Sequence, residues 1–434
     1  MEILLKRRTV AVLMVCMLHA GSFLNRIEAK DYPDGGASNT KNVVIPDTVV
    51  YEPMLGYKFA RATPNEIKDR RNTLFPFFYR LNALRGDEDT VCTVSVVHIG
   101  DSHIQADFMT GTTRKLMNHY FGNPGRGLVS PNRLMKSNNG RHYKISSATQ
   151  WAHSFVVRPT AVPIGITGLG LKSYGRTAQV SLLTVDESFP GEWDFNSITA
   201  YGDFESSDAY IREAESSVLI DHYAKSFALD HLTNQIDIDF VSPDKKEICF
   251  FGLNLSNGHR GVFYHSIGIN GACFGHYSNK AGFYEQLPSL APELVIVSMG
   301  TNESMRAFNY SQFYNEIAEF VNRIEKAAPN VTVLLTTPPE TYSRNRHTPN
   351  QRMVQIRKTI VDFAENNGYP YWDLFSITGG KGSAPEWNRK QLLTRDKIHF
   401  TRRGYEYQGE LLFEALMKSY NRFAKSVKSV QGER

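Results

Sequence analysis

At 434 residues, the chain is long enough for two domains, or for one domain with a large insertion. Hydrophobic residues make up 41% and charged residues 21% of the sequence, which is typical of a globular protein. The net charge of +5 is small for this length and no nucleic-acid module stands out, so nucleic acid is not an expected partner.

The N-terminus has the pattern of a secretory signal peptide over residues 1–29. Three basic residues at positions 6–8 precede an apolar run at 10–18, and small residues follow as far as Ala29. The apolar run is shorter than the roughly 20 residues of a transmembrane helix, although an uncleaved anchor is an alternative. We therefore expect a periplasmic or secreted protein with no stable membrane span after signal cleavage. Export would leave too few cysteines for a disulfide framework: Cys92, Cys249 and Cys273.

After an irregular lead-in at 30–66, the chain begins an alternation of helices and strands. A helix is predicted over residues 65–85, and a β-branched strand over 91–99. A second helix is predicted over 104–120. The Gly100-Asp101-Ser102 segment therefore lies at a strand-to-helix turn, where we expect the Asp101 side chain to hold the backbone.

The middle of the chain, residues 141–256, has a different rhythm. Short alternating segments at 178–185, 217–221 and 235–240 are separated by clusters of turn residues. This pattern predicts an inserted antiparallel β-sandwich domain of about 100 residues. Four aromatic residues of this region could stack on sugar rings, but we expect most of them to fill the sandwich core: Trp151, Trp193, Tyr201 and Tyr210.

The alternation of strands and helices returns in residues 257–434. The predicted elements are strands at 294–299, 331–336 and 369–374, and helices at 311–328, 351–366 and 402–425, the last capped by Thr401. Alternating strands and helices indicate an α/β fold with a parallel sheet covered on both faces. Residues 30–140 and 257–434 are therefore predicted to form one α/β domain, which the β domain interrupts.

Three residues of the predicted α/β domain could perform nucleophilic catalysis. Ser102 would lie at the carboxyl end of the sheet, His399 would act as its base, and Asp396 would orient the His399 ring. Each pattern alone also fits an ordinary structure, namely a turn for Ser102 and a solvent-facing loop for the Asp-x-x-His pair. The pair gains weight because it follows the last predicted strand, on the side where the sheet presents Ser102.

Attack on an ester also requires donors that stabilise the negative oxygen which forms. The backbone amides of Ser102 and Gly271 and the side chain of Asn302 could supply them. Taken singly, Gly271 could be a turn glycine and Asn302 a helix cap. His103 could line the pocket, whereas His98 is expected to be structural. The sequence predicts neither a cofactor nor a metal, because no His or Cys cluster has ligand spacing.

Together these segments resemble the four blocks of the SGNH (GDSL-type) hydrolase family. The resemblance covers about residues 91–127 and 260–420, and the matching segments are Gly100-Asp101-Ser102, Ile269-Asn270-Gly271-Ala272, Gly300-Thr301-Asn302-Glu303 and Asp396-x-x-His399. It implies a three-layer α/β/α fold with Ser102 as nucleophile, an Asp396–His399 pair, and oxyanion donors at Ser102, Gly271 and Asn302. Many members carry Asp where this chain has Glu303, which should leave the asparagine's role intact.

The Gly-Asp-Ser-His segment, the long β insertion and Gly-Thr-Asn-Glu resemble peptidoglycan O-acetylesterases of Gram-negative bacteria. In those enzymes the insertion is similar to a family 35 carbohydrate-binding module. The resemblance implies an O-acetylesterase that removes acetate from the 6-hydroxyl of N-acetylmuramic acid. The implied partner is an acetylated glycan polymer, peptidoglycan in the first instance, and no residue pattern specifies an oligomeric state.

Three other functions fit the same residues. A polysaccharide O-acetyltransferase would use the same acyl-enzyme but pass the acetyl group to a sugar. An acetylxylan-type esterase would differ only in its polymer. A carbohydrate-binding protein with an inactive hydrolase half is disfavoured, because decay should have struck Ser102 or His399.

Overall fold

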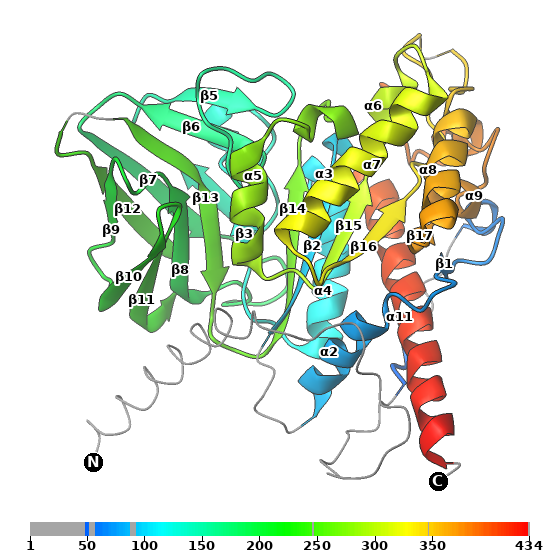
Figure 1. Ribbon diagram of the computed structural model, residues 1–434, viewed down its shortest axis with the longest axis horizontal. Coiled ribbons are helices and arrows are strands. Elements are labelled where there is room, and N and C mark those ends of the chain that lie inside the picture. Colours follow the sequence, from blue (N-terminus) through cyan, green and yellow to red (C-terminus); the bar gives the residue numbers. More distant parts are fainter. Residues whose placement is uncertain (1–47, 52–56, 87–92, 245–246, 346, 433–434) are drawn as a thin grey trace.

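The computed structural model describes residues 48–51, 57–86, 93–244, 247–345 and 347–432 (Figure 1). A mostly parallel sheet with helices on both faces occupies one side of the molecule, and two antiparallel sheets occupy the other. The fold is α/β with an additional antiparallel β domain, as predicted. The proposed signal peptide at 1–29 and Cys92 lie outside the described residues.

Six strands form the mostly parallel sheet: β1 (Ile67–Lys68), β2 (Thr93–Gly100), β14 (Gly261–Gly268), β15 (Leu294–Ser298), β16 (Thr332–Thr336) and β17 (Tyr371–Trp372). Their order is β1-β17-β16-β15-β2-β14, and every neighbouring pair is parallel except β1 with β17. The β-branched residues of β2 and β15 suit strands that are buried on both faces. Because β2 pairs with β14 on one side and β15 on the other, all parallel, its carboxyl end lies between theirs.

Helices cover both faces of this sheet. Alternate residues of β2 point to opposite faces. Val94 and Val96 share a core with side chains of α2 (Phe75–Arg85), α4 (Phe108–Phe121) and α11 (Arg402–Gly432). Val97 and Ile99 share the other core with α5 (Ala281–Gln286), α7 (Tyr310–Ala327) and α8 (Met353–Asn367). The result is the predicted three-layer α/β/α arrangement (Figure 1).

The antiparallel domain contains a seven-stranded and a four-stranded sheet. The larger has the order β10-β11-β8-β13-β6-β5, with β3 paired to β13, and the smaller has the order β4-β7-β12-β9. Buried and more exposed residues alternate along β7 and β12, and Val180 and Ile238 share a core with Phe250 of β13. The sheets therefore pack as a sandwich. The bounds are β3 (Gly127–Val129), β4 (Tyr143–Ser146), β5 (Ala152–Phe155), β6 (Leu169–Ser173), β7 (Thr177–Thr184), β8 (Phe195–Gly202), β9 (Asp208–Tyr210), β10 (Ser216–Asp221), β11 (Ala224–Thr233), β12 (Gln235–Val241) and β13 (Ile248–Ser256).

Most of the predicted elements are present. The strands expected at 178–185, 217–221 and 235–240 correspond to β7, β10 and β12. In the α/β part, β15, β16, α7 and α8 fall within a few residues of their predicted bounds. The amide of Gly404 donates to Thr401 Oγ1 (3.3 Å), so Thr401 caps α11 as expected. Because β3 precedes residue 141 yet joins β13, the domain limits of 141 and 256 stay predictions.

Two predicted helices are wrong in part, and each break has a local cause. The helix expected over 65–85 begins only at Phe75, because the Asp69 carboxylate accepts the amides of Thr73 and Leu74 (both 2.9 Å) and holds a turn there. The helix expected over 104–120 is divided into α3 (Ser102–Gln105) and α4. Asp107 separates them with a left-handed φ of 56°, which a continuous right-handed helix excludes.

Two strand predictions also need correction. The strand expected over 369–374 is limited to Tyr371–Trp372, because the Asp373 side chain accepts the Ser376 amide and begins α9 (Leu374–Ile377). The strand β14 was not predicted. It contains the buried His265, whose ring nitrogen accepts the Leu128 amide (3.0 Å). Because this strand includes polar residues, its sequence does not indicate that the strand is buried.

The aromatic residues of the β domain mostly fill its core, as expected. Of the four aromatic residues considered from the sequence, Trp193 and Tyr201 are fully buried, Trp151 packs against the core, and Tyr210 is exposed. Cys249 and Cys273 are buried free thiols, as expected for small core residues. Within the described residues, no helix combines the length and apolar character that crossing a membrane requires.

Candidate active site

A tight turn at the end of β2 positions Ser102. The Asp101 carboxylate accepts the His103 amide (2.9 Å) and caps α3, as the sequence indicates. Gly100 is required by close approach, since a Cβ there would lie 2.3 Å from Ile104 Cγ1 and 2.7 Å from the Ser298 carbonyl oxygen. The turn thus presents Ser102 at the carboxyl end of β2.

A loop immediately before α11 brings Asp396 and His399 to the same edge. The Asp396 Oδ1 atom accepts the amides of Ile398 (2.8 Å) and His399 (2.9 Å), which fixes the carboxylate within its own loop. Its Oδ2 atom lies 2.7 Å from His399 Nδ1, and His399 Nε2 lies 2.8 Å from Ser102 Oγ. The structure therefore brings together three residues that the sequence separates by about 300 positions.

The charge on Asp396 suits this arrangement. Burial alone would raise the pKa of Asp396, but hydrogen bonds from the His399 ring, the His399 and Ile398 amides and the Thr394 hydroxyl hold it well below its usual range. The carboxylate is therefore ionised at neutral pH. Because it accepts the Nδ1 proton, the neutral His399 ring is left with Nε2 free to accept the Ser102 hydroxyl proton.

Two candidate oxyanion donors, Gly271 and Asn302, follow β14 and β15, the strands on either side of β2. Gly271 follows β14 with a φ of +83°, a conformation that favours glycine. Asn302 lies in α6 (Thr301–Ser304), where its Nδ2 atom donates to the Ala272 carbonyl oxygen (2.9 Å) and lies 3.4 Å from Asp101 Oδ2. Both N–H groups of the amide therefore have acceptors, and the longer hydrogen bond, to Asp101, is the one that a substrate oxygen would replace.

Glu303, where the sequence departs from the SGNH pattern, connects the segments that carry Asn302 and Gly271. Its Oε1 atom accepts the Phe274 amide (2.9 Å), which ties α6 to the turn that follows Gly271. Glu303 is buried, and burial raises its pKa to about 7 although the Phe274 hydrogen bond opposes the shift. The substitution of Glu for Asp is therefore compatible with an intact donor arrangement.

The raised pKa of Glu303 predicts a specific pH dependence of stability. Between its unfolded pKa of about 4.3 and its folded pKa of about 7, the folded state holds a proton that the unfolded state lacks, so burial of Glu303 lowers stability as pH rises. In Glu303→Gln this effect is absent. We expect the unfolding free energy of the variant, minus that of the wild type, to increase by about 1–3 kcal/mol from pH 4 to pH 8. Urea unfolding at several pH values measures the difference, and a pH-independent difference would contradict the assignment.

Two other histidines near Ser102 are buried. His98 lies between Tyr264 Oη (2.8 Å from Nδ1) and Ser298 Oγ (2.7 Å from Nε2), and burial lowers its pKa to about 3, so its role is structural as expected. His103 packs against the His399 ring at a centroid distance of 5.3 Å, and its Nδ1 atom lies 2.9 Å from Tyr405 Oη. His103 thus packs on the His399 ring and helps to fix its position. The spacing of residues in the sequence does not reveal this contact.

A buried cluster of charged residues, which was not predicted from the sequence, lies at the start of α4. Asp107 pairs with Arg114 (2.9 Å) and Arg126 (2.8 Å), and all three are almost fully buried. Burial alone would raise the pKa of Asp107, but the two guanidinium groups hold it well below its usual range. Arg126 immediately precedes β3, so the cluster fixes the start of α4 to the base of the antiparallel domain. No described group of three His, Cys, Asp or Glu side chains is placed to hold a metal ion.

The parallel sheet, the strand-to-helix turn and the Asp396–His399–Ser102 geometry define a serine hydrolase of α/β fold. Residues 251–407 match the sequence profile of the GDSL-like Lipase/Acylhydrolase family. This segment is therefore similar to carboxylic ester hydrolases of the SGNH, or GDSL-like, type. The matched segment contains Gly271, Asn302, Asp396 and His399 but not Ser102, which only the fold brings to them.

One solved structure supports the same fold, and others are similar over part of the chain. A peptidoglycan O-acetylesterase is similar with a TM-score of 0.65 and 20% identity, over 82% of this chain and 99% of that chain. A lipase/acylhydrolase from Enterococcus faecalis shows 18% identity over 37% of this chain and 77% of its own, with a TM-score of 0.29. An acetylxylan esterase from Geobacillus stearothermophilus shows 18% identity over 37% of this chain and 73% of its own, with a TM-score of 0.28. A comparison with curated proteins found no match.

Proposed function

We propose that this protein removes O-acetyl groups from cell-wall glycan, specifically the 6-O-acetyl group of N-acetylmuramic acid in peptidoglycan. The observation that carries the proposal is the continuous chain of hydrogen bonds from Asp396 through His399 to Ser102, at the edge of the sheet where Asn302 also lies. The likeness in fold to a peptidoglycan O-acetylesterase supports the choice of polymer.

The reaction follows from the geometry. His399 Nε2 takes the Ser102 hydroxyl proton while Ser102 Oγ attacks the acetyl carbonyl carbon. The carbonyl oxygen becomes negative and accepts hydrogen bonds from the Ser102 and Gly271 amides and the Asn302 side chain. His399 then gives its proton to the sugar oxygen as the ester bond breaks, which leaves the acetyl group on Ser102. Water, deprotonated by His399, attacks this acetyl-enzyme and releases acetate.

The site is open enough for a polymeric substrate. The His399 side chain is 36% exposed and that of Asp396 33%, so an acetyl group that projects from a glycan strand can reach Ser102 without entering a deep cavity. We further propose that the antiparallel domain contributes to glycan binding. The signal pattern at 1–29 favours export, so the proposed location is periplasmic or secreted, where cell-wall glycan is accessible.

The polymer is tested by acetate release from O-acetylated peptidoglycan and from acetylxylan, each treated with the wild type and with Ser102→Ala. We expect faster release from peptidoglycan by the wild type and none above background by the variant. A strong preference for xylan would overturn the proposed polymer. Transfer of acetyl to added oligosaccharide in place of release to water would identify a transferase.

The role of Asn302 predicts a selective loss of turnover. In Asn302→Ala one oxyanion donor is absent, and we expect kcat for p-nitrophenyl acetate to fall by about 10²–10³-fold with little change in KM. The matched control is Asn309→Ala, which removes the side-chain cap of α7 (Asn309 Oδ1 to Gln312 N, 2.9 Å) away from the site. That variant should lose stability but keep kcat. An unchanged kcat in Asn302→Ala would exclude the amide as a donor.

A further inference from the structure

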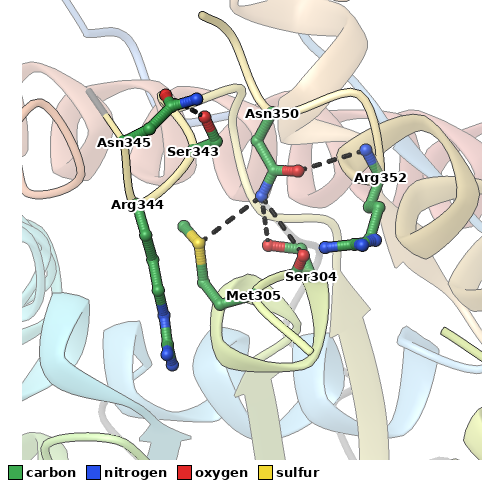
Figure 2. A pocket seen from close by; sticks show the side chains of 7 residues that line it. All are labelled: Ser304, Met305, Ser343, Arg344, Asn345, Asn350 and Arg352. Carbon is green, nitrogen blue, oxygen red and sulfur yellow. Dashed lines mark hydrogen bonds between the residues drawn. The ribbon is translucent and has the colours of Figure 1, made fainter. Parts of the chain in front are cut away.

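Figure 2 shows a cavity of about 260 Å³ that is lined by six polar residues and Met305. The end of α6 provides Ser304 and Met305 to its lining. The segment between β16 and α8 provides Ser343, Arg344, Asn345 and Asn350, and Arg352 completes the lining at the start of α8. None of these residues belongs to the four segments that resemble SGNH hydrolases. Ser304 is the residue directly after the third segment.

Hydrogen bonds hold the floor of this cavity in place. The buried Asn350 side chain donates to Ser304 Oγ (2.8 Å), and Asn350 Oδ1 accepts the Arg352 amide (3.1 Å), as Figure 2 shows. The Ser343 hydroxyl donates to Asn345 Oδ1 (2.7 Å), and the Ser343 amide donates to the Thr348 carbonyl oxygen (3.0 Å). Hydrogen bonds therefore stabilise the segment between β16 and α8 internally and also connect it to α6.

The cavity is positively charged. In the view of Figure 2, Arg344 and Arg352 lie on opposite sides of Asn350. Both arginines are exposed, and neither guanidinium group pairs with a carboxylate among the described residues. The lining contains no Asp or Glu. Two unneutralised guanidinium groups beside serine and asparagine side chains suit an oxyanion, because each guanidinium presents N–H donors in a planar fork.

The cavity adjoins both halves of the catalytic arrangement. Ser304 and Met305 of the lining follow Asn302 by two and three residues at the end of α6. On the other side, the Tyr342 amide, next to Ser343 of the lining, donates to the carbonyl oxygen of Lys397, next to Asp396 (3.0 Å). The segments that line the cavity are therefore joined to the segments that carry Asn302 and Asp396.

We propose that this cavity binds a carboxylate of the glycan substrate, so that the enzyme selects acetylated glycans that carry an acid close to the acetyl group. This inference rests on the proposed function. The carboxylate has two possible sources in peptidoglycan, namely the lactyl ether of the acetylated muramic acid and the peptide attached to it. Neutral polymers such as acetylxylan offer neither group.

The test compares the wild type with the double variant Arg344→Gln/Arg352→Gln. For O-acetylated peptidoglycan, we expect kcat/KM of the variant to fall by about tenfold or more, mainly through KM, because charge-assisted hydrogen bonds are lost. For p-nitrophenyl acetate and acetylxylan, kcat/KM should stay within about twofold of the wild type, since these esters lack the acid. Glycan strands freed of peptide and intact peptidoglycan, assayed in parallel, assign the carboxylate to the sugar or to the peptide.

A matched control is Arg70→Gln, an exposed arginine of the α/β domain, which should leave all three rates unchanged. Equal losses on charged and neutral esters, or no loss on peptidoglycan, would overturn the carboxylate site. Failure of the proposed function is distinct, because the wild type would then release no more acetate from glycan than Ser102→Ala.

Discussion

Replacing Ser102 with alanine should lower kcat for acetyl esters by about 10⁴-fold or more, and leave the fold intact. The reason is that Ser102 Oγ is the only side-chain atom within hydrogen-bond distance of His399 Nε2 among the described residues. Without it, no acetyl-enzyme forms, and the remaining rate comes only from binding and oxyanion donors. Release of p-nitrophenol from p-nitrophenyl acetate measures this change directly.

Ser242→Ala is a suitable control, because it removes a buried hydroxyl group of the antiparallel domain, which donates to the Ser206 carbonyl oxygen (3.1 Å), and it does not touch His399. It should cost stability and leave kcat within about tenfold of the wild type. A Ser102→Ala variant that turns over at the wild-type rate would show that another group attacks the ester.

The second large effect is expected for Asp396→Asn. The asparagine amide cannot accept the Nδ1 proton of His399 through its nitrogen, which favours the tautomer whose Nε2 is protonated and unable to accept the Ser102 proton. We expect kcat to fall by about 10²–10⁴-fold, with KM largely unchanged. Steady-state kinetics with p-nitrophenyl acetate give both constants.

The corresponding control is Asp362→Asn, which removes a carboxylate from the exposed face of α8, where it pairs with Lys358. This variant should retain wild-type kcat and lose little stability, as is usual for exposed ion pairs. Because the asparagine side chain does not ionise, raising the pH cannot supply the missing carboxylate in Asp396→Asn. Full activity of Asp396→Asn at any pH would contradict the assigned role.

The layers of the fold could be predicted because strong periodic signals control them. The β-branched run of β15 and the helical spacing of Phe313, Ile317 and Phe320 in α7 each agree with burial against the same sheet. Where local polar chemistry controls the backbone, the prediction was wrong. Asp69 holds a turn in place of a helix, and Asp107 takes a left-handed conformation that two buried arginines stabilise.

The residues of the candidate site could be predicted from the sequence, but the side chains that pack around them could not. Ser102, Gly271, Asn302, Asp396 and His399 lie in short segments whose order is distinctive, and a parallel sheet brings strand ends together at one edge. The packing of His103 on His399 and the cavity around Arg344 and Arg352 depend on contacts between distant segments. No spacing in the sequence encodes those contacts, so only the folded structure reveals them.

The central claim is that the acetyl group passes through Ser102. The most direct test mixes the enzyme with p-nitrophenyl acetate, quenches it in acid during the first turnover, and locates acetyl groups by peptide mass spectrometry. The account predicts one acetyl group on the peptide that contains Ser102, and none on that peptide in Ser102→Ala. An acetyl-enzyme at a different residue, formed at the rate of turnover, would contradict it.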